Sequence, residues 1–107
     1  MSQQKQPRVI GVGAANVDVH GQSRKAIVMR DSNPSYMATS VGGVTRNILE
    51  NLARQSVPVA LLSAVGDDLY GEKILRDSTA AGIDLSHVRV KPGAISSTYI
   101  AILDERG

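Results

Sequence analysis

The chain has 107 residues, a size that suits one modest domain with a single core and is too short for two. Hydrophobic residues make up 42% and charged residues 21%, the composition of an ordinary folded protein. The net charge is +2, the basic residues are scattered, and three tyrosines are the only aromatic residues. We therefore expect no binding of a nucleic-acid polymer, which favours clustered basic residues and aromatic rings that stack on bases.

Cysteine is absent, which excludes disulfides and thiolate metal sites. His20 and His87 lie far apart without a neighbouring ligand pattern, so each is expected on the surface. No apolar run is long enough for a transmembrane helix, and "MSQQKQP" has no apolar segment of the kind a signal peptide needs. The sequence thus predicts a cytoplasmic protein with no membrane partner, in which residues 1–7 form a disordered polar tail.

The first half of the chain predicts strands. Residues 9–14, "VIGVGA", form a short apolar run with glycines, which is typical of a buried strand. Residues 17–22 alternate apolar and polar, as in a strand with one solvated face. Residues 30–35, "RDSNPS", are rich in turn formers, and residues 36–41 could return as a second strand. The two strands would make a hairpin-like ribbon.

From Val44 the spacing of apolar residues becomes helical, and Pro58 ends the helix. Its apolar face is expected to carry Val44, Ile48, Leu49 and Leu52, with Arg46, Glu50 and Arg54 elsewhere. The run at 59–65, "VALLSAV", predicts one strand buried on both faces.

The last third predicts a second helix and two further strands. "GDD" at 66–68 forms a turn able to cap a helix over about 69–81, with Ile74 and Leu75 inward and Gly82 just after its end. Residues 88–90 and 98–103 are the strands. Strands that alternate with helices indicate an α/β sheet with parallel crossovers, to which the antiparallel strands are added.

"GVGAAN" at 11–16 looks like a dinucleotide-binding fingerprint, but Asn16 replaces the third glycine and a strand follows in place of a helix. We therefore reject that function. Asn16 and Asp18 instead follow the carboxyl end of the first strand, where open α/β sheets bind ligands. Two residues apart on a strand, they can project to the same side, and a carboxylate there could accept hydrogen bonds from sugar hydroxyls. A solvated aspartate in a turn is the other interpretation.

Gly42 and Gly43 precede the first helix directly, at a cost in conformational entropy. Without side chains they let a ligand approach the free N–H groups of the helix N-terminus, which taken alone suggests a phosphate site. Asn47, one turn further, could add its side-chain amide. A loop that merely needs glycine dihedral angles remains the alternative.

Residues 42–71, "GGVTRNILENLARQSVPVALLSAVGDDLYG", resemble the first signature of the ribokinase-like carbohydrate kinases, the PfkB family. The matching positions are Gly42, Gly43, Asn47, Ser56 and Gly66, and Asn16 with Asp18 matches the N-x-D of the family. "DSNP" at 31–34 followed by "GGVTRN" most resembles its pseudouridine kinase branch. Thr45 and Leu49 depart from the small residues that the signature prefers.

The resemblance implies a mostly parallel α/β sheet with flanking helices and a β-strand lid, of which residues 8–107 would form the N-terminal portion. The lid strands would lie at about 17–41 and 97–104, and the α/β part at about 8–16 and 44–90. The family's substrate contacts fall on Asp18, Gly42, Gly43 and Asn47, with Asn16 in support. These family contacts imply that the N-terminus of the helix starting at Val44 binds mainly the sugar and not a phosphate.

The activity implied for a complete enzyme is phosphoryl transfer from ATP, with Mg²⁺, to the 5′-hydroxyl of pseudouridine or a related nucleoside or pentose. The second signature, with the catalytic aspartate, is absent from these residues, so the chain alone is expected to be inactive, to bind ATP and Mg²⁺ incompletely and to hold no metal. The alternative is a non-catalytic module that binds a small molecule or assembles through the lid, for example as a homodimer. In that case we expect the apolar residues Leu61, Leu62 and Val65 to be exposed.

Overall fold

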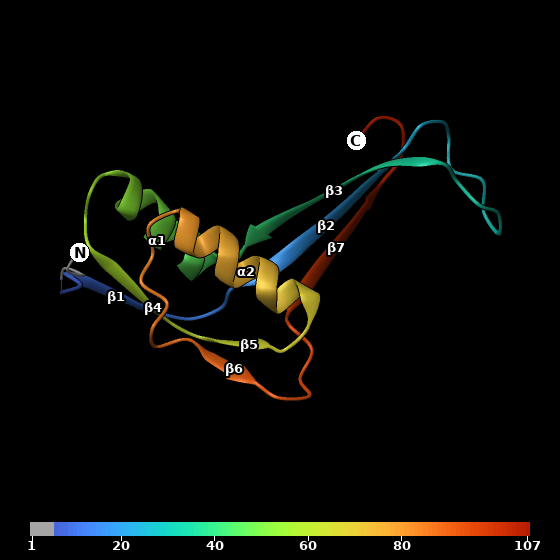
Figure 1. Cartoon of the computed structure of the whole chain (residues 1–107). Helices are drawn as coiled ribbons and strands as arrows, with labels where there is room; N and C mark the ends of the chain where they lie inside the picture. Colours follow the sequence, from blue (N-terminus) through green and yellow to red (C-terminus); the bar gives the residue numbers. More distant parts are fainter. Residues whose placement is uncertain (1–5) are drawn as a thin grey trace.

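The computed structural model describes residues 6–107, and Figure 1 shows their arrangement. Most of the predicted tail at residues 1–7 therefore lies outside the described residues. In chain order the elements are β1 (Val9–Val12), β2 (Asn16–Ser23), β3 (Ser35–Gly42), α1 (Val44–Arg54), β4 (Val59–Leu62), β5 (Ala64–Gly66), α2 (Leu69–Ala80), β6 (Arg89–Lys91) and β7 (Thr98–Leu103). Each predicted helix and strand has a counterpart close to its expected position.

The strands form three small sheets. β1 pairs in parallel with β4, and β5 pairs in parallel with β6. The third sheet has the order β3-β2-β7, in which β2 is antiparallel to β3 and parallel to β7. Figure 1 shows this three-stranded sheet projecting away from the helices, with the start of β2 and the end of β3 next to them. The predicted combination of parallel α/β pairing and antiparallel strands is confirmed.

The run at 59–65 is two strands, which corrects the single strand expected from its apolar residues. The chain changes partner at Ser63: Gly13 N–H donates to the Leu62 carbonyl, whereas Arg89 N–H donates to the Ser63 carbonyl. β4 therefore belongs with β1, and β5 belongs with β6. Apolar composition predicts extended backbone but does not reveal such a change of neighbour.

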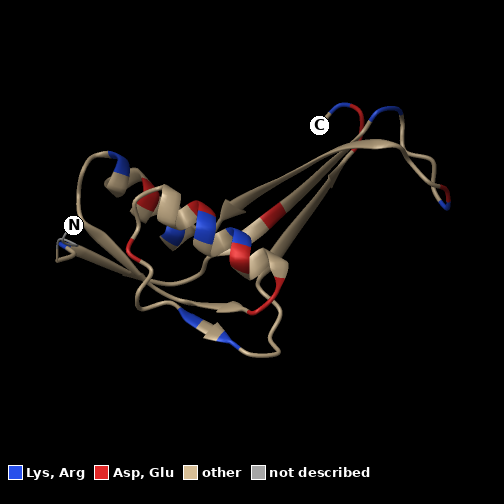
Figure 2. Ribbon diagram, in the orientation of Figure 1, with Lys and Arg blue, Asp and Glu red and all other residues tan. Residues whose placement is uncertain are grey.

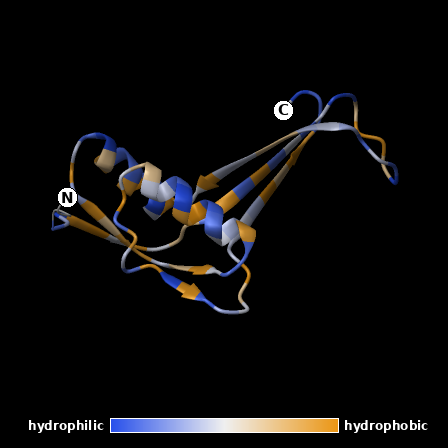
Figure 3. Ribbon diagram, in the orientation of Figure 1, coloured by the Kyte–Doolittle hydropathy of each residue, from blue (hydrophilic) through white to orange (hydrophobic). Residues whose placement is uncertain are grey.

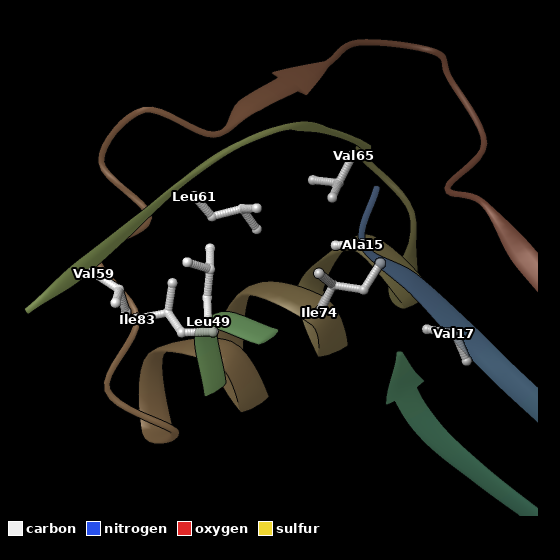
Figure 4. Close-up of a cluster of buried hydrophobic side chains, with 8 residues drawn as sticks. All are labelled: Ala15, Val17, Leu49, Val59, Leu61, Val65, Ile74 and Ile83. Carbon is white, nitrogen blue, oxygen red and sulfur yellow. The ribbon is translucent and has the colours of Figure 1, made fainter. Parts of the chain in front are cut away.

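The core lies between α1, α2 and strands β4 and β5. Leu49 of α1 points toward Leu61 of β4 in Figure 4, with Ile74 of α2 and Ile83 beside them. Leu61 and Val65 are buried, at 0% and 3% exposure, and contradict the expectation that they form an exposed apolar surface. Of Leu61, Leu62 and Val65, only Leu62 is exposed. Figure 3 shows the apolar strands β1 and β4 side by side.

The buried face of α1 also differs from the expected one. Leu49 is buried, but Val44 and Ile48 are 78% and 54% exposed, whereas Arg46 is only 4% exposed. The face that packs against the core is set by where β4 and α2 lie, which helical periodicity alone does not specify. A buried arginine is tolerated here because polar partners surround it.

Candidate functional site

A cleft of about 520 Å³ opens where the start of β2, the N-terminus of α1 and the start of β7 meet. Four of the five residues singled out from the sequence line it: Asn16, Asp18, Gly43 and Asn47. Gly42 lies directly against Asp18. The remaining lining residues are Ala14, Val44, Thr45, Ser97, Thr98 and Tyr99.

Asn16 and Asp18 project to the same side of β2, as their spacing predicts. Asn16 Nδ2 donates a hydrogen bond of 2.6 Å to Asp18 Oδ1. Asp18 is the one acidic residue in the three strands of its sheet, and Figure 2 shows the single red segment on β2. The other carboxylate oxygen, Oδ2, faces the backbone of β3 at Gly42, where an added Cβ atom would lie 2.5 Å from it. Glycine at 42 is what lets the carboxylate occupy this place.

Gly43 forms the N-cap of α1 with φ of 103°, a backbone conformation that favours glycine. An added Cβ atom would lie 2.5 Å from the carbonyl oxygen of Ala14, so the chain after β1 passes close to the helix end. Among the described residues, no side chain caps this end. The N–H groups of the first helical turn, which lack partners within a helix, therefore remain available beside Val44 and Thr45 in the cleft.

Strand β7 supplies residues that the sequence did not identify. Its parallel register with β2 places Thr98 opposite Val17 and Tyr99 opposite Asp18. Tyr99 is 63% exposed, and it also lines a smaller cleft of about 340 Å³ that shares Asp18 and continues past His20 and Ser40. The resemblance implies that this strand belongs to the lid with residues 17–41, but the sequence contains no signal for its pairing with β2.

The segment that leads into β7 is fixed by Asp68, the residue that caps α2. Its carboxylate accepts hydrogen bonds from Gly71 N–H (2.8 Å), Ser96 N–H (2.9 Å) and the Ser96 hydroxyl (2.7 Å). Ser96 Oγ in turn accepts from Gly66 N–H at 2.9 Å. The Ser96 hydroxyl is the main cause that lowers the pKa of Asp68 below its ordinary value. The predicted cap of α2 at residues 66–68 is confirmed in Asp68. Because Asp68 also binds Ser96, it fixes the position of the following residues Ser97 and Thr98, which line the cleft.

The cleft presents one carboxylate, two side-chain amides and backbone N–H groups, which are groups that form hydrogen bonds with hydroxyls. Within residues 6–107, no three or more His, Cys, Asp or Glu side chains gather where they could hold a metal ion. The same residues also include no helix long and apolar enough to cross a membrane.

Comparisons with known structures define the class of fold. A Clostridium perfringens protein assigned as a sugar kinase matches with a TM-score of 0.89 and 39% identity, covering 96% of this chain and 33% of its own. Ribokinase of Arabidopsis thaliana, solved with ribose and ATP, matches with a TM-score of 0.85, covering 96% of this chain and 34% of its own. Because the two sequences are only 21% identical, this likeness shows the fold alone. The fold is therefore ribokinase-like, as expected.

Sequence comparison gives the family. Pseudouridine kinase of Escherichia coli K12 is 39% identical over 99 residues, which cover 92% of this chain and 32% of that enzyme. The model of the pfkB family of carbohydrate kinases matches residues 6–107, and the chain belongs to this family. It spans about a third of the length of these relatives.

Proposed function

We propose that this chain forms the substrate-binding portion of an ATP-dependent kinase that phosphorylates a nucleoside or pentose in the cytoplasm, with pseudouridine as the favoured substrate and its 5′-hydroxyl as the acceptor. Family membership and the 39% identity to a pseudouridine kinase support it. The observation that carries it is the Asp18 carboxylate, oriented by Asn16 and set over Gly42 in the cleft.

In this proposal Asp18 accepts hydrogen bonds from sugar hydroxyls while Asn47 contacts a neighbouring hydroxyl. The two residues fix the sugar so that its reacting hydroxyl points toward the phosphoryl donor, which is a positioning role. Gly42 and Gly43 let the sugar approach the backbone at the start of α1. We assign the sheet β3-β2-β7, at about residues 17–41 and 97–104, as the lid. Residues 8–16 and 44–90 are assigned to the α/β part.

A nucleoside is favoured over a free pentose because the smaller cleft continues from the sugar position. It shares Asp18 and Tyr99 with the main cleft, so a ring attached to the sugar would extend past His20 along the sheet. The exposed ring of Tyr99 can stack on a planar base.

Phosphoryl transfer also requires a group that deprotonates the hydroxyl and groups that bind the nucleotide. ATP with Mg²⁺ supplies the phosphoryl group. In this proposal, residues outside 1–107 remove the proton and bind the nucleotide, in a part of the fold that corresponds to the two thirds of the relatives that this chain does not span. Residues 1–107 alone would therefore not catalyse the reaction.

The test is a calorimetric titration of pseudouridine into the protein expressed from its complete reading frame, with ribose and uridine for comparison. We expect saturable binding and about tenfold weaker binding for Asp18→Asn, which keeps the size of the side chain and loses its charge. Asp104→Asn, an exposed aspartate outside both clefts, is the matched control and should bind normally. Absence of binding to all three ligands, or normal binding by Asp18→Asn, would contradict the proposal.

A second function, assembly through the lid, is favoured by the opposite face of the same sheet. Met37, Ile100 and Ile102 are 65%, 64% and 79% exposed there and border an apolar cleft of about 320 Å³. We propose that this face pairs two copies of the chain. Sedimentation analysis should show a dimer that Ile100→Asp converts to a monomer, and a wild-type monomer at all concentrations would exclude it.

A further inference from the structure

Arg46 precedes Asn47, which lines the cleft, and its charged side chain is buried, with 5% of its surface exposed. Each nitrogen of its guanidinium has a different partner. Nε donates to Ser78 Oγ of α2 at 3.0 Å, Nη2 lies 3.0 Å from Glu50 Oε1, and Nη1 donates to Asn47 Oδ1 at 3.2 Å. Arg46 therefore links helix α2 to a residue proposed to contact the substrate.

These contacts hold the guanidinium in one place. A buried charge without polar partners is costly, so the position that satisfies all three nitrogens is strongly preferred. Ser78 is fully buried and Glu50 is anchored by Arg54 as well, at 3.5 Å. Among the described residues, every buried side-chain nitrogen and oxygen has a hydrogen-bond partner. Figure 2 shows segments of opposite charge along both α1 and α2.

The fixed guanidinium determines which way the Asn47 amide faces. Guanidinium nitrogens donate hydrogen bonds and accept none, so the amide atom next to Arg46 must be the oxygen. The Nδ2 end of Asn47, which only donates, is left for a ligand. Across the cleft, Asp18 carries a carboxylate that only accepts, and Asn16 already occupies its Oδ1. The two sides of the cleft therefore offer opposite hydrogen-bonding groups.

We propose that Arg46 is a positioning residue that fixes the Asn47 amide with its donor end toward the substrate. The cleft then selects two hydroxyls, one donating to Asp18 and one accepting from Asn47, as adjacent hydroxyls of a sugar can do. The identity of the ligand rests on the proposed function, whereas the orientation of Asn47 can be tested without any ligand.

The first experiment uses the ligand-free protein. The side-chain amide of Asn47, assigned through Asn47→Ala, is followed by ¹⁵N NMR in the wild type, Arg46→Met and Arg54→Met. Arg54→Met is the matched control because Arg54 also pairs with Glu50 but is 66% exposed and has no hydrogen bond to Asn47. We expect a higher side-chain order parameter in the wild type and control than in Arg46→Met. Equal order in all three would overturn the proposal.

The second experiment is a double-mutant cycle on pseudouridine affinity. Arg46→Met should weaken binding about fivefold in the wild-type background and have almost no effect in Asn47→Ala, because Arg46 acts through that amide. An equal loss in both backgrounds would indicate that Arg46 only supports the packing of the helices and would overturn the proposal.

Arg46→Lys covers the case in which Arg46→Met fails to fold. Lysine keeps a buried cation next to Glu50 but lacks the planar fork that reaches Ser78 and Asn47 together. It should show the same loss of Asn47 order, and wild-type order in a folded Arg46→Lys protein would overturn the proposal. An ordered Asn47 amide in a wild type that binds none of the ligands would support the positioning role and reject the proposed function, so the two failures are distinguishable.

Discussion

Asn16 and Asp18 form a hydrogen-bonded pair on one side of β2, with Asn16 Nδ2 donating to Asp18 Oδ1 at 2.6 Å. The pair commits one carboxylate oxygen to the protein and leaves Oδ2 at the edge of the cleft, against Gly42. A carboxylate held in this way has less orientational entropy to lose when a ligand binds.

Replacing Asn16 by leucine should therefore weaken ligand binding without unfolding the protein. Asn16→Leu keeps the approximate shape but removes the donor that orients Asp18, and we expect pseudouridine affinity to fall about fivefold in calorimetry. Asn51→Leu, an exposed asparagine of α1, serves as the control and should bind as the wild type does. Unchanged affinity in Asn16→Leu would show that Asp18 needs no orientation.

The two adjacent glycines should respond differently to alanine. In Gly42→Ala the new methyl group meets Asp18 Oδ2, the end of a side chain that can move, so affinity should fall while stability changes little. In Gly43→Ala it meets the Ala14 carbonyl at a φ of 103°, and neither backbone can yield easily. We expect Gly43→Ala to lower the free energy of unfolding by about 3 kcal/mol in urea titrations. Equal destabilisation by both variants would contradict this account.

Asp68 should make stability depend on acidity. Its pKa is lowered in the folded state, first by the Ser96 hydroxyl and then by the Ser96 and Gly71 N–H groups, so the folded protein binds its proton less readily than the unfolded chain. The contribution is complete above the unfolded pKa of about 4 and is lost as pH falls through the lower folded value.

Urea unfolding between pH 7 and pH 3 measures this contribution. Asp68→Asn should be less stable than the wild type at pH 7 and lose less stability on acidification. Ser96→Ala, which removes the main cause of the lowered pKa, should reduce the acid dependence as well. A wild type and an Asp68→Asn variant with parallel pH profiles would refute the role assigned to this carboxylate.

The buried face of α1 can be checked with two neighbouring residues. Leu49→Ala should lower the free energy of unfolding by about 3 kcal/mol, because it leaves a cavity next to Leu61. Ile48→Ala, where the side chain is 54% exposed, should cost less than about 1 kcal/mol. The reverse order would mean that Ile48 faces the core, as the apolar spacing of the sequence had suggested.

Local sequence patterns predicted the elements well because these depend on local physics. Gly43 and Pro58 bracket α1, and Asp68 with Gly82 bracket α2, since glycine, proline and capping aspartate act on backbone within one turn. The run at 59–65 was interpreted wrongly as one strand, because its division at Ser63 depends on neighbours distant in the sequence.

The sequence by itself determined that Asn16 and Asp18 share one side of a strand and that two glycines open the start of α1, because strand periodicity and the missing Cβ atoms are properties of adjacent residues. Only the tertiary structure decided that Tyr99 stands beside Asp18 and that Arg46 is buried against Ser78. Both depend on pairing between segments far apart in the chain, where long-range packing selects one of many sequence-compatible arrangements.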